Sequence, residues 1–180
     1  MQVRNGSRFA LCIAACLLLA GCGFHLRRSA ALPQVMAQQV YLKVEGGTAF
    51  ERSLAAALRA NKVDVLNAPA EGVPMLDVTK AAFSSRLLTS GYQRVGEYNV
   101  GMHVEFGLKD GSGTTLIPVQ TIDLSHEFAV DQTQFSAITS ETESIRRSLV
   151  REMTDAVMRR LEAHARDGVP VPSTPTPPAG

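Results

Sequence analysis

A strict alternation of apolar residues from Glu97 to Lys109 constrains the fold of this 180-residue chain more than any other feature. Successive side chains of a β-strand point to opposite faces, so residues two apart share a face. One face would carry Tyr98, Val100, Met102, Val104, Phe106 and Leu108, and the other Gly101, His103, Glu105, Gly107 and Lys109. The sequence therefore predicts a long strand that buries one face and leaves the other open.

Two further strands are expected beside this one. Residues 110–113, Asp-Gly-Ser-Gly, have the composition of a hairpin turn. The return strand is expected over Leu116 to Val130, with Leu116, Ile122, Leu124, Phe128 and Val130 on its apolar face. Pro118 lacks an amide donor, so we expect it near the strand start or at a sheet edge. Residues 75–88 form a weaker strand pattern, followed by a turn at Gly91.

The preceding residues predict a strand followed by a helix. Apolar and polar residues alternate from Gln39 to Glu45, which is typical of a half-buried strand. Thr48 and Glu51 have the spacing of a capping box at a helix start. Apolar residues then recur at helical spacing: Phe50, Leu54, Ala57 and Leu58. Asn61 is expected as a left-handed C-cap, and residues 67–74 contain the prolines and glycine of a loop.

The strongest helix pattern of the chain lies near its C-terminus. Ser140 and Glu143 form a second capping-box pattern. A single apolar stripe follows over about 20 residues: Ile145, Leu149, Met153, Ala156, Val157 and Leu161. The arginines beside the stripe are interpreted as a solvated face paired with nearby acids; they are Arg146, Arg147, Arg151, Arg159 and Arg160. Gly168 and Pro170 end the helix, and residues 169–180 predict a disordered, proline-rich tail.

This order of elements predicts an α+β fold over residues 39–168. Strand, helix, three strands and helix favour a single α/β sandwich domain: a four-stranded mixed sheet with two α-helices packed on one face. The first connection passes through a helix, so the first two strands are expected to be parallel. With one face covered, His103, Glu105 and Lys109 would remain open to solvent or to a partner.

The first 22 residues have the pattern of a lipoprotein signal. Arg4 and Arg8 precede an apolar run that is too short for a membrane-spanning helix, which needs about 20 residues. The run closes on Leu-Ala-Gly-Cys at residues 19–22, the pattern of a bacterial lipobox. We expect cleavage of residues 1–21, acylation of Cys22 and a lipidated tether over residues 22–38. In the alternative, the signal is an ordinary one and Cys22 is incidental.

Charge and cysteine content exclude two classes of function. Removing residues 1–21 takes Arg4 and Arg8, which leaves 16 of the 18 Lys and Arg residues against 17 Asp and Glu. A near-neutral chain lacks the concentrated positive face that duplex binding requires, so no nucleic-acid partner is expected. Cys12 and Cys16 leave with the signal and Cys22 is blocked by lipid. The mature domain would therefore contain no disulfide and carry out no thiol chemistry.

No constellation of residues predicts an enzyme or a metal site. His103 and His126 lie on strands that should pair and could approach each other, but no third ligand has a fixed spacing to them. Asp123, Ser125 and His126 suggest a catalytic triad only superficially, because Ser125 and His126 are neighbours that point to opposite strand faces. Nucleophile elbows, phosphate-binding loops and zinc-protease motifs are missing from the sequence.

The residues from Cys22 to Arg27, Cys-Gly-Phe-His-Leu-Arg, resemble the mature N-terminus of the lipopolysaccharide-assembly lipoprotein family LptE. The pair Glu97-Tyr98 also resembles the start of the family's central strand. Arg28 departs from the family, in which many members have glycine there. The resemblance implies a four-stranded sheet backed by two helices. Gly23 after the cysteine implies export to the outer membrane.

The resemblance also implies partners. Members of the family plug the outer-membrane β-barrel LptD, and are reported to bind lipopolysaccharide through basic residues at one end of the sheet. It implies no cofactor beyond the N-acyl and S-diacylglycerol groups on Cys22.

Arg86 matches the family's basic position best. Lys80 and Arg94 lie in the same segment, which contains no acid, and all three could instead be ordinary surface cations. Residues 131–144 contain no Lys or Arg, so a second basic point is not expected; Thr139 or its neighbours stand there. The competing hypothesis is a free, periplasm-facing lipoprotein that binds a small ligand or peptide on its open sheet face.

Overall fold

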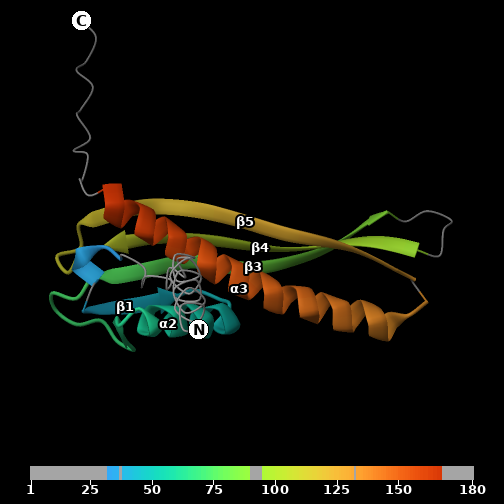
Figure 1. Cartoon of the computed structure of the whole chain (residues 1–180), viewed down its shortest axis with the longest axis horizontal. Coiled ribbons are helices and arrows are strands. Elements are labelled where there is room, and N and C mark those ends of the chain that lie inside the picture. The colour runs from blue at the N-terminus through green and yellow to red at the C-terminus, as the bar shows by residue number, and fades with distance from the viewer. Residues whose placement is uncertain (1–31, 37, 90–94, 132, 168–180) are drawn as a thin grey trace, which may run out of the picture.

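A computed structural model describes residues 32–36, 38–89, 95–131 and 133–167. Along the chain the elements are the 3-10 helix η1 (Gln34–Met36), β1 (Gln39–Val44), α2 (Thr48–Ala60), β2 (Asp64–Leu66), β3 (Met75–Thr89), β4 (Val95–Lys109), β5 (Thr115–Asp131) and α3 (Phe135–Asp167). The strands form one mixed sheet in the order β2-β1-β3-β4-β5. Both helices cover the same face of this sheet, as predicted (Figure 1).

The described sheet has five strands, so the prediction of four was wrong. The additional strand is β2, whose three residues pair in parallel with β1 from Gln39↔Asp64 to Tyr41↔Leu66. Three residues are too few for alternation to distinguish a strand from a loop. The parallel pairing predicted for the first two strands is confirmed for β1 and β3, while β3, β4 and β5 are antiparallel to their neighbours.

The core lies between the helices and the apolar face of the sheet. Its fully buried side chains come from both layers and include Phe50, Leu54, Leu58, Val100, Val104, Phe106, Leu149, Met153, Val157 and Leu161. All of these positions belong to the apolar stripes predicted from the sequence. Among the residues that the structure describes, no helix combines the length and apolar character needed to span a membrane.

A β-bulge reverses the expected orientation at the start of β5. Phe106 pairs with Gln120 but Leu108 pairs with Ile117, so β5 contains one extra residue between these pairs. Consequently Ile117 is 3% exposed in the core and Leu116, predicted to face inward, is 37% exposed. A Cβ on Gly107 would lie 3.1 Å from the Ile117 carbonyl oxygen, so glycine permits this close approach. Pro118 lies within this irregularity on an edge strand, as predicted.

Both predicted capping boxes were wrong. Helix α2 has Gly47 as its N-cap, in the left-handed conformation (φ 64), and no side chain caps it. Thr48 is already the first helical residue. At the other end Asn61 is the C-cap, but its φ is −92 and Lys62 adopts the positive φ of 66 instead. A glycine pair before a helix can supply the turn by backbone conformation alone, which removes the need for a capping hydroxyl.

Helix α3 begins at Phe135, five residues before the predicted start at Ser140. The turn before it is stabilised by Asp131, whose carboxylate accepts bonds from the Thr133 amide (2.9 Å) and hydroxyl (2.7 Å). The hydrogen bond from the Thr133 amide, and next the one from its hydroxyl, hold the pKa of Asp131 below its ordinary value. Ser140 lies inside the helix and donates to the Ala137 carbonyl at 3.1 Å, as serines within helices commonly do.

Candidate interaction surface

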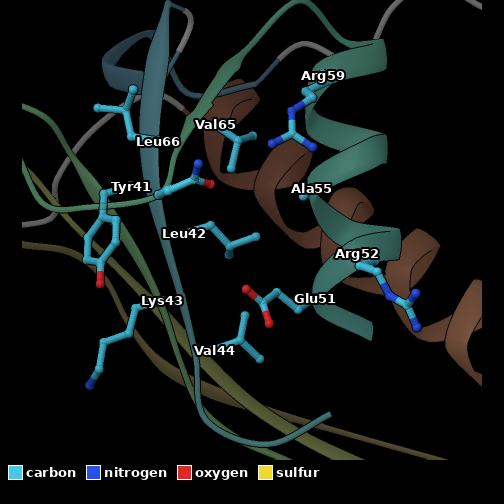
Figure 2. A pocket seen from close by; sticks show the side chains of 11 residues that line it. Tyr41, Leu42, Lys43, Val44, Glu51, Arg52, Ala55, Arg59, Val65 and Leu66 are labelled. Carbon is cyan, nitrogen blue, oxygen red and sulfur yellow. The ribbon is translucent and has the colours of Figure 1, made fainter. Parts of the chain in front are cut away.

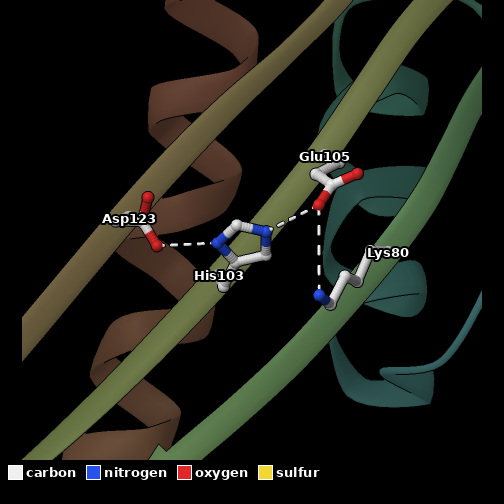
Figure 3. Close-up of polar contacts among 4 residues, drawn as sticks. All are labelled: Lys80, His103, Glu105 and Asp123. Atoms are coloured by element: carbon white, nitrogen blue, oxygen red, sulfur yellow. Dashed lines mark hydrogen bonds and ion pairs between the residues drawn. The ribbon is translucent and has the colours of Figure 1, made fainter.

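Four ionisable side chains form a network across the open face of the sheet (Figure 3). His103 of β4 lies 2.7 Å from Asp123 of β5 through Nδ1 and 2.9 Å from Glu105 through Nε2. The Glu105 carboxylate is also 4.0 Å from the Nζ atom of Lys80, on β3. The three strands place these groups on one face because the register pairs His103 with Asp123, and Lys80 with Glu105. The network therefore links three strands on the side away from the helices.

The network favours the protonated imidazole of His103. The bond to Glu105 is the largest cause that raises the His103 pKa, followed by the bond to Asp123, while burial and the charge of Lys80 oppose the rise. Because both ring nitrogens already lie against carboxylates, the ring acts as a bridge between β4 and β5. The side chain of Asp123 is 72% exposed, so this bridge is screened by water.

We expect the bridge to give a small pH dependence of stability. The pKa of His103 is higher in the folded state than in the unfolded state. Its contribution to the free energy of unfolding is therefore fully present below about pH 6.5 and is lost as pH rises through the folded-state pKa. The loss should be about 0.2–1 kcal/mol, the range for exposed pairs. Urea unfolding of the wild type and His103→Gln at pH 6 and pH 8.5 measures it. A difference between the two proteins that does not shrink at the higher pH would contradict the expectation.

The possible approach of His103 and His126 is not realised. His126 pairs with Val100 and points to the helix-covered face, where its Nε2 lies 3.0 Å from both carboxylate oxygens of Glu152 on α3. His103 occupies the opposite face. The pairing partner of His126 is Val100, three residues before His103 on β4. Residues an odd number apart on a strand point to opposite faces, so strand alternation alone separates the two histidines. The same alternation separates Ser125 from His126, as expected.

The two described basic residues of the predicted site, Arg86 and Lys80, do not lie close together. Arg86 and Lys80 both lie on β3, six residues apart, which corresponds to about 20 Å along a strand. The segment from Lys80 to Arg94 contains no acid in the sequence, but the fold places Glu105 of the neighbouring strand beside Lys80. Arg86 is exposed, pairs in register with Asn99, and forms no ion pair within the part of the chain that the structure describes. Arg94 and Cys22 lie outside the described residues.

Exposed apolar side chains lie at the same end of the sheet as Arg86. Leu87, Leu88 and Val95 are 44%, 48% and 49% exposed, and Phe135, at the start of α3, is 77% exposed. Val95 pairs with Asp131, four residues before Phe135, so the start of β4, the end of β5 and the start of α3 lie at the same end of the molecule (Figure 1). We call Arg86, Leu87, Leu88, Val95 and Phe135 the tip surface. The sequence indicated Arg86, but nothing in the alternation marks Val95 or Phe135 as exposed.

The fold is a small two-layer α+β domain. Solved structures share this fold. A lipoprotein B from Nitrosomonas europaea has a TM-score of 0.66 at 22% identity, with 81% of this chain and 94% of that chain covered. The rare lipoprotein B from Shewanella oneidensis has a TM-score of 0.62 at 19% identity, covering 72% and 98%. A minor lipoprotein from Acinetobacter baumannii gives 0.60 at 18% identity, covering 71% and 92%.

The sequence also matches a family model. The model of LptE, described as lipopolysaccharide-assembly, matches residues 35–161. The chain therefore belongs to the LptE family, as the residues after Cys22 had indicated. No curated protein matches the chain significantly.

Proposed function

We propose that this protein is an outer-membrane lipoprotein that acts, without enzymatic activity, as plug and assembly factor of the LptD β-barrel and binds lipopolysaccharide. The observation that carries the proposal is the LptE family match, which covers α2, all the described strands and α3 as far as residue 161. The acyl groups on Cys22 would hold the protein on the periplasmic side of the outer membrane.

The tip surface offers the chemistry that lipopolysaccharide binding requires. Lipid A presents phosphate groups beside acyl chains, so a binding surface needs a cation without a competing acid next to apolar side chains. Arg86 supplies the cation, and Leu87, Leu88 and Val95 supply exposed apolar surface at the same end of the sheet. Lys80 meets the demand for a cation without a competing acid less well, because Glu105 lies 4.0 Å away.

Extraction in mild detergent tests the proposed complex. We expect the acylated protein to co-purify with a large β-barrel protein in a constant ratio. The same membranes, treated with protease before extraction, should yield an intact domain because a barrel would enclose it. Recovery of a monomer that is cut as readily as the purified protein would instead support a free, periplasm-facing lipoprotein and reject the plug.

Arg86→Ala is expected to weaken lipopolysaccharide binding and to flatten its dependence on salt. Removing one contact to a phosphate removes one screened interaction, and charge-assisted hydrogen bonds of this kind contribute about 1.5–3 kcal/mol. Binding of purified protein to lipopolysaccharide, measured from 50 to 500 mM salt, gives both quantities.

Lys80→Ala is the matched control for that experiment. It removes a cation of the same strand whose charge is already opposed by Glu105, so its effect should be the smaller one. Equal binding by wild type and Arg86→Ala at every salt concentration would exclude Arg86 from the site.

A further inference from the structure

A groove opens between β1 and α2, where β2 ends early (Figure 2). It has a volume of about 650 Å³ and is lined by residues of β1, α2 and the end of β2. Ligand sites in proteins commonly have volumes of about 300–1,000 Å³. The groove lies at the β2 edge of the sheet, on the helix-covered side, and takes no part in the tip surface.

One wall of the groove is the open edge of a β-strand. The amides of Tyr41 and Glu45 donate to the Pro74 and Val78 carbonyls of the β3 side, at 2.9 and 2.8 Å. Backbone groups of a strand alternate between its two edges, so Val44 directs its amide and carbonyl toward the groove. The last residue of β2, Leu66, pairs only with Tyr41. Within the described residues, no strand accompanies Val44 on that edge.

The remaining walls combine an apolar floor with opposite charges. Leu42, Ala55 and Val65 are 7%, 8% and 8% exposed, and Leu42 and Val65 point toward α2 (Figure 2). Arg59 reaches into the gap near β2, whereas Glu51 reaches into it nearer Val44. Neither Arg59 nor Glu51 forms an ion pair inside the described ranges. Two further cations line the groove: Lys43, which pairs with Glu45 and Asp77, and Arg52, which bonds the Thr48 carbonyl. The groove thus offers Arg59 at one end and Glu51 at the other, each without an ion pair in the described part of the chain, and apolar contact between them.

We propose that this β1 groove binds an extended segment of a partner protein, which adds a strand beside β1 in line with β2. Such a segment would pair its backbone with Val44, place an acidic side chain against Arg59 and place a basic one against Glu51. An acyl chain would cover the floor but leave the Val44 backbone groups without hydrogen bonds, which is costly once water is excluded. Addition of a strand satisfies them, and exposed strand edges commonly recruit extended peptides in this way.

Amide hydrogen exchange of the full-length acylated protein tests this proposal. One sample is extracted in mild detergent with its bound proteins, and the other is separated from them in high salt. Fragmentation to single residues should show the Val44 amide exchanging at least about tenfold more slowly in the first sample. Tyr41 and Glu45 already donate to β3, so their amides should be protected in both samples and serve as internal references.

Substitution of helix arginines supplies matched variants. Arg59→Glu and Arg59→Gln should abolish the extra protection of Val44. Arg151→Glu should keep it, since Arg151 of α3 is exposed, bonds the Ser148 hydroxyl of its own helix at 3.0 Å and does not line the groove. Circular dichroism of each variant establishes that the fold is kept.

The outcome is independent of the barrel partner proposed above. Equal exchange of Val44 in the two samples, fast or slow, overturns the groove proposal even if a barrel co-purifies. Protection that survives Arg59→Glu also overturns it. Protection lost in Arg59→Glu supports it even if the extracted sample contains no barrel, a result that would reject the plug and leave another protein as the partner.

Discussion

Replacing Cys22 with alanine is expected to abolish acylation and with it the independent attachment of the protein to the membrane. Each buried CH₂ group of an acyl chain contributes about 0.8 kcal/mol, and one C14 chain alone binds a bilayer with an association constant of only about 10⁴ M⁻¹. Several chains on one cysteine would make attachment effectively permanent. Incorporation of labelled palmitate, followed by mass spectrometry of the mature N-terminus, measures the change directly.

Cys16→Ala is the matched control, because Cys16 lies inside the signal and should be removed with it. Its palmitate incorporation should equal that of the wild type. The isolated wild-type protein should partition into a detergent-rich phase and the non-acylated mature domain into the aqueous phase. A wild-type mature protein whose Cys22 is unmodified or missing would contradict both the lipobox and the proposed location.

Ile117→Ala is expected to cost about 2–5 kcal/mol of unfolding free energy. Ile117 is 3% exposed at the bulge of β5, so truncation leaves a cavity in the core. Domains of this size are stable by about 5–15 kcal/mol, so the loss would be a large share of the total. Equilibrium denaturation in urea measures it.

Leu116→Ala is the matched control for this prediction, since it removes an apolar side chain from the adjacent residue. Leu116 is 37% exposed, and substitutions at such positions usually change stability by no more than about 0.5 kcal/mol. Without the bulge, Leu116 would face the core and Ile117 the solvent, so Leu116→Ala would be the more destabilising substitution. A larger loss for Leu116→Ala than for Ile117→Ala would therefore reject the register shift between Phe106 and Leu108.

The sequence predicted the elements with long periodic patterns and failed at those determined by a few residues. The stripe from Ile145 to Leu161 and the alternation of β4 repeat often enough to be recognised, and both were confirmed. The three-residue strand β2 and the start of α3 at Phe135 were missed. Short elements depend on what lies beside them: β2 forms because β1 offers an edge, and α3 starts early because Asp131 holds the turn.

The interaction surfaces show the same division. Sequence reasoning identified Arg86 as a basic residue without nearby acids, and no ion pair of Arg86 was found among the described residues. It gave Lys80 the same character, although Glu105 of the neighbouring strand lies beside it. It also gave no indication of the groove at Val44. That edge of β1 is unpaired because β2 ends at Leu66, and the length of β2 could not be predicted from the sequence of β1. Charges and edges contributed by other strands are not visible in a local pattern.

The order of amino acids by itself determined which face of each long element is apolar, and hence an α+β sheet with both helices on one face. Burial enforces this outcome, because a period of two or of 3.6 residues specifies the buried face within the element itself. Only the tertiary structure decided the fifth strand, the reversal at Ile117 and the groove beside β1. These features arise from register and strand ends, which are set by pairing between segments far apart in the chain.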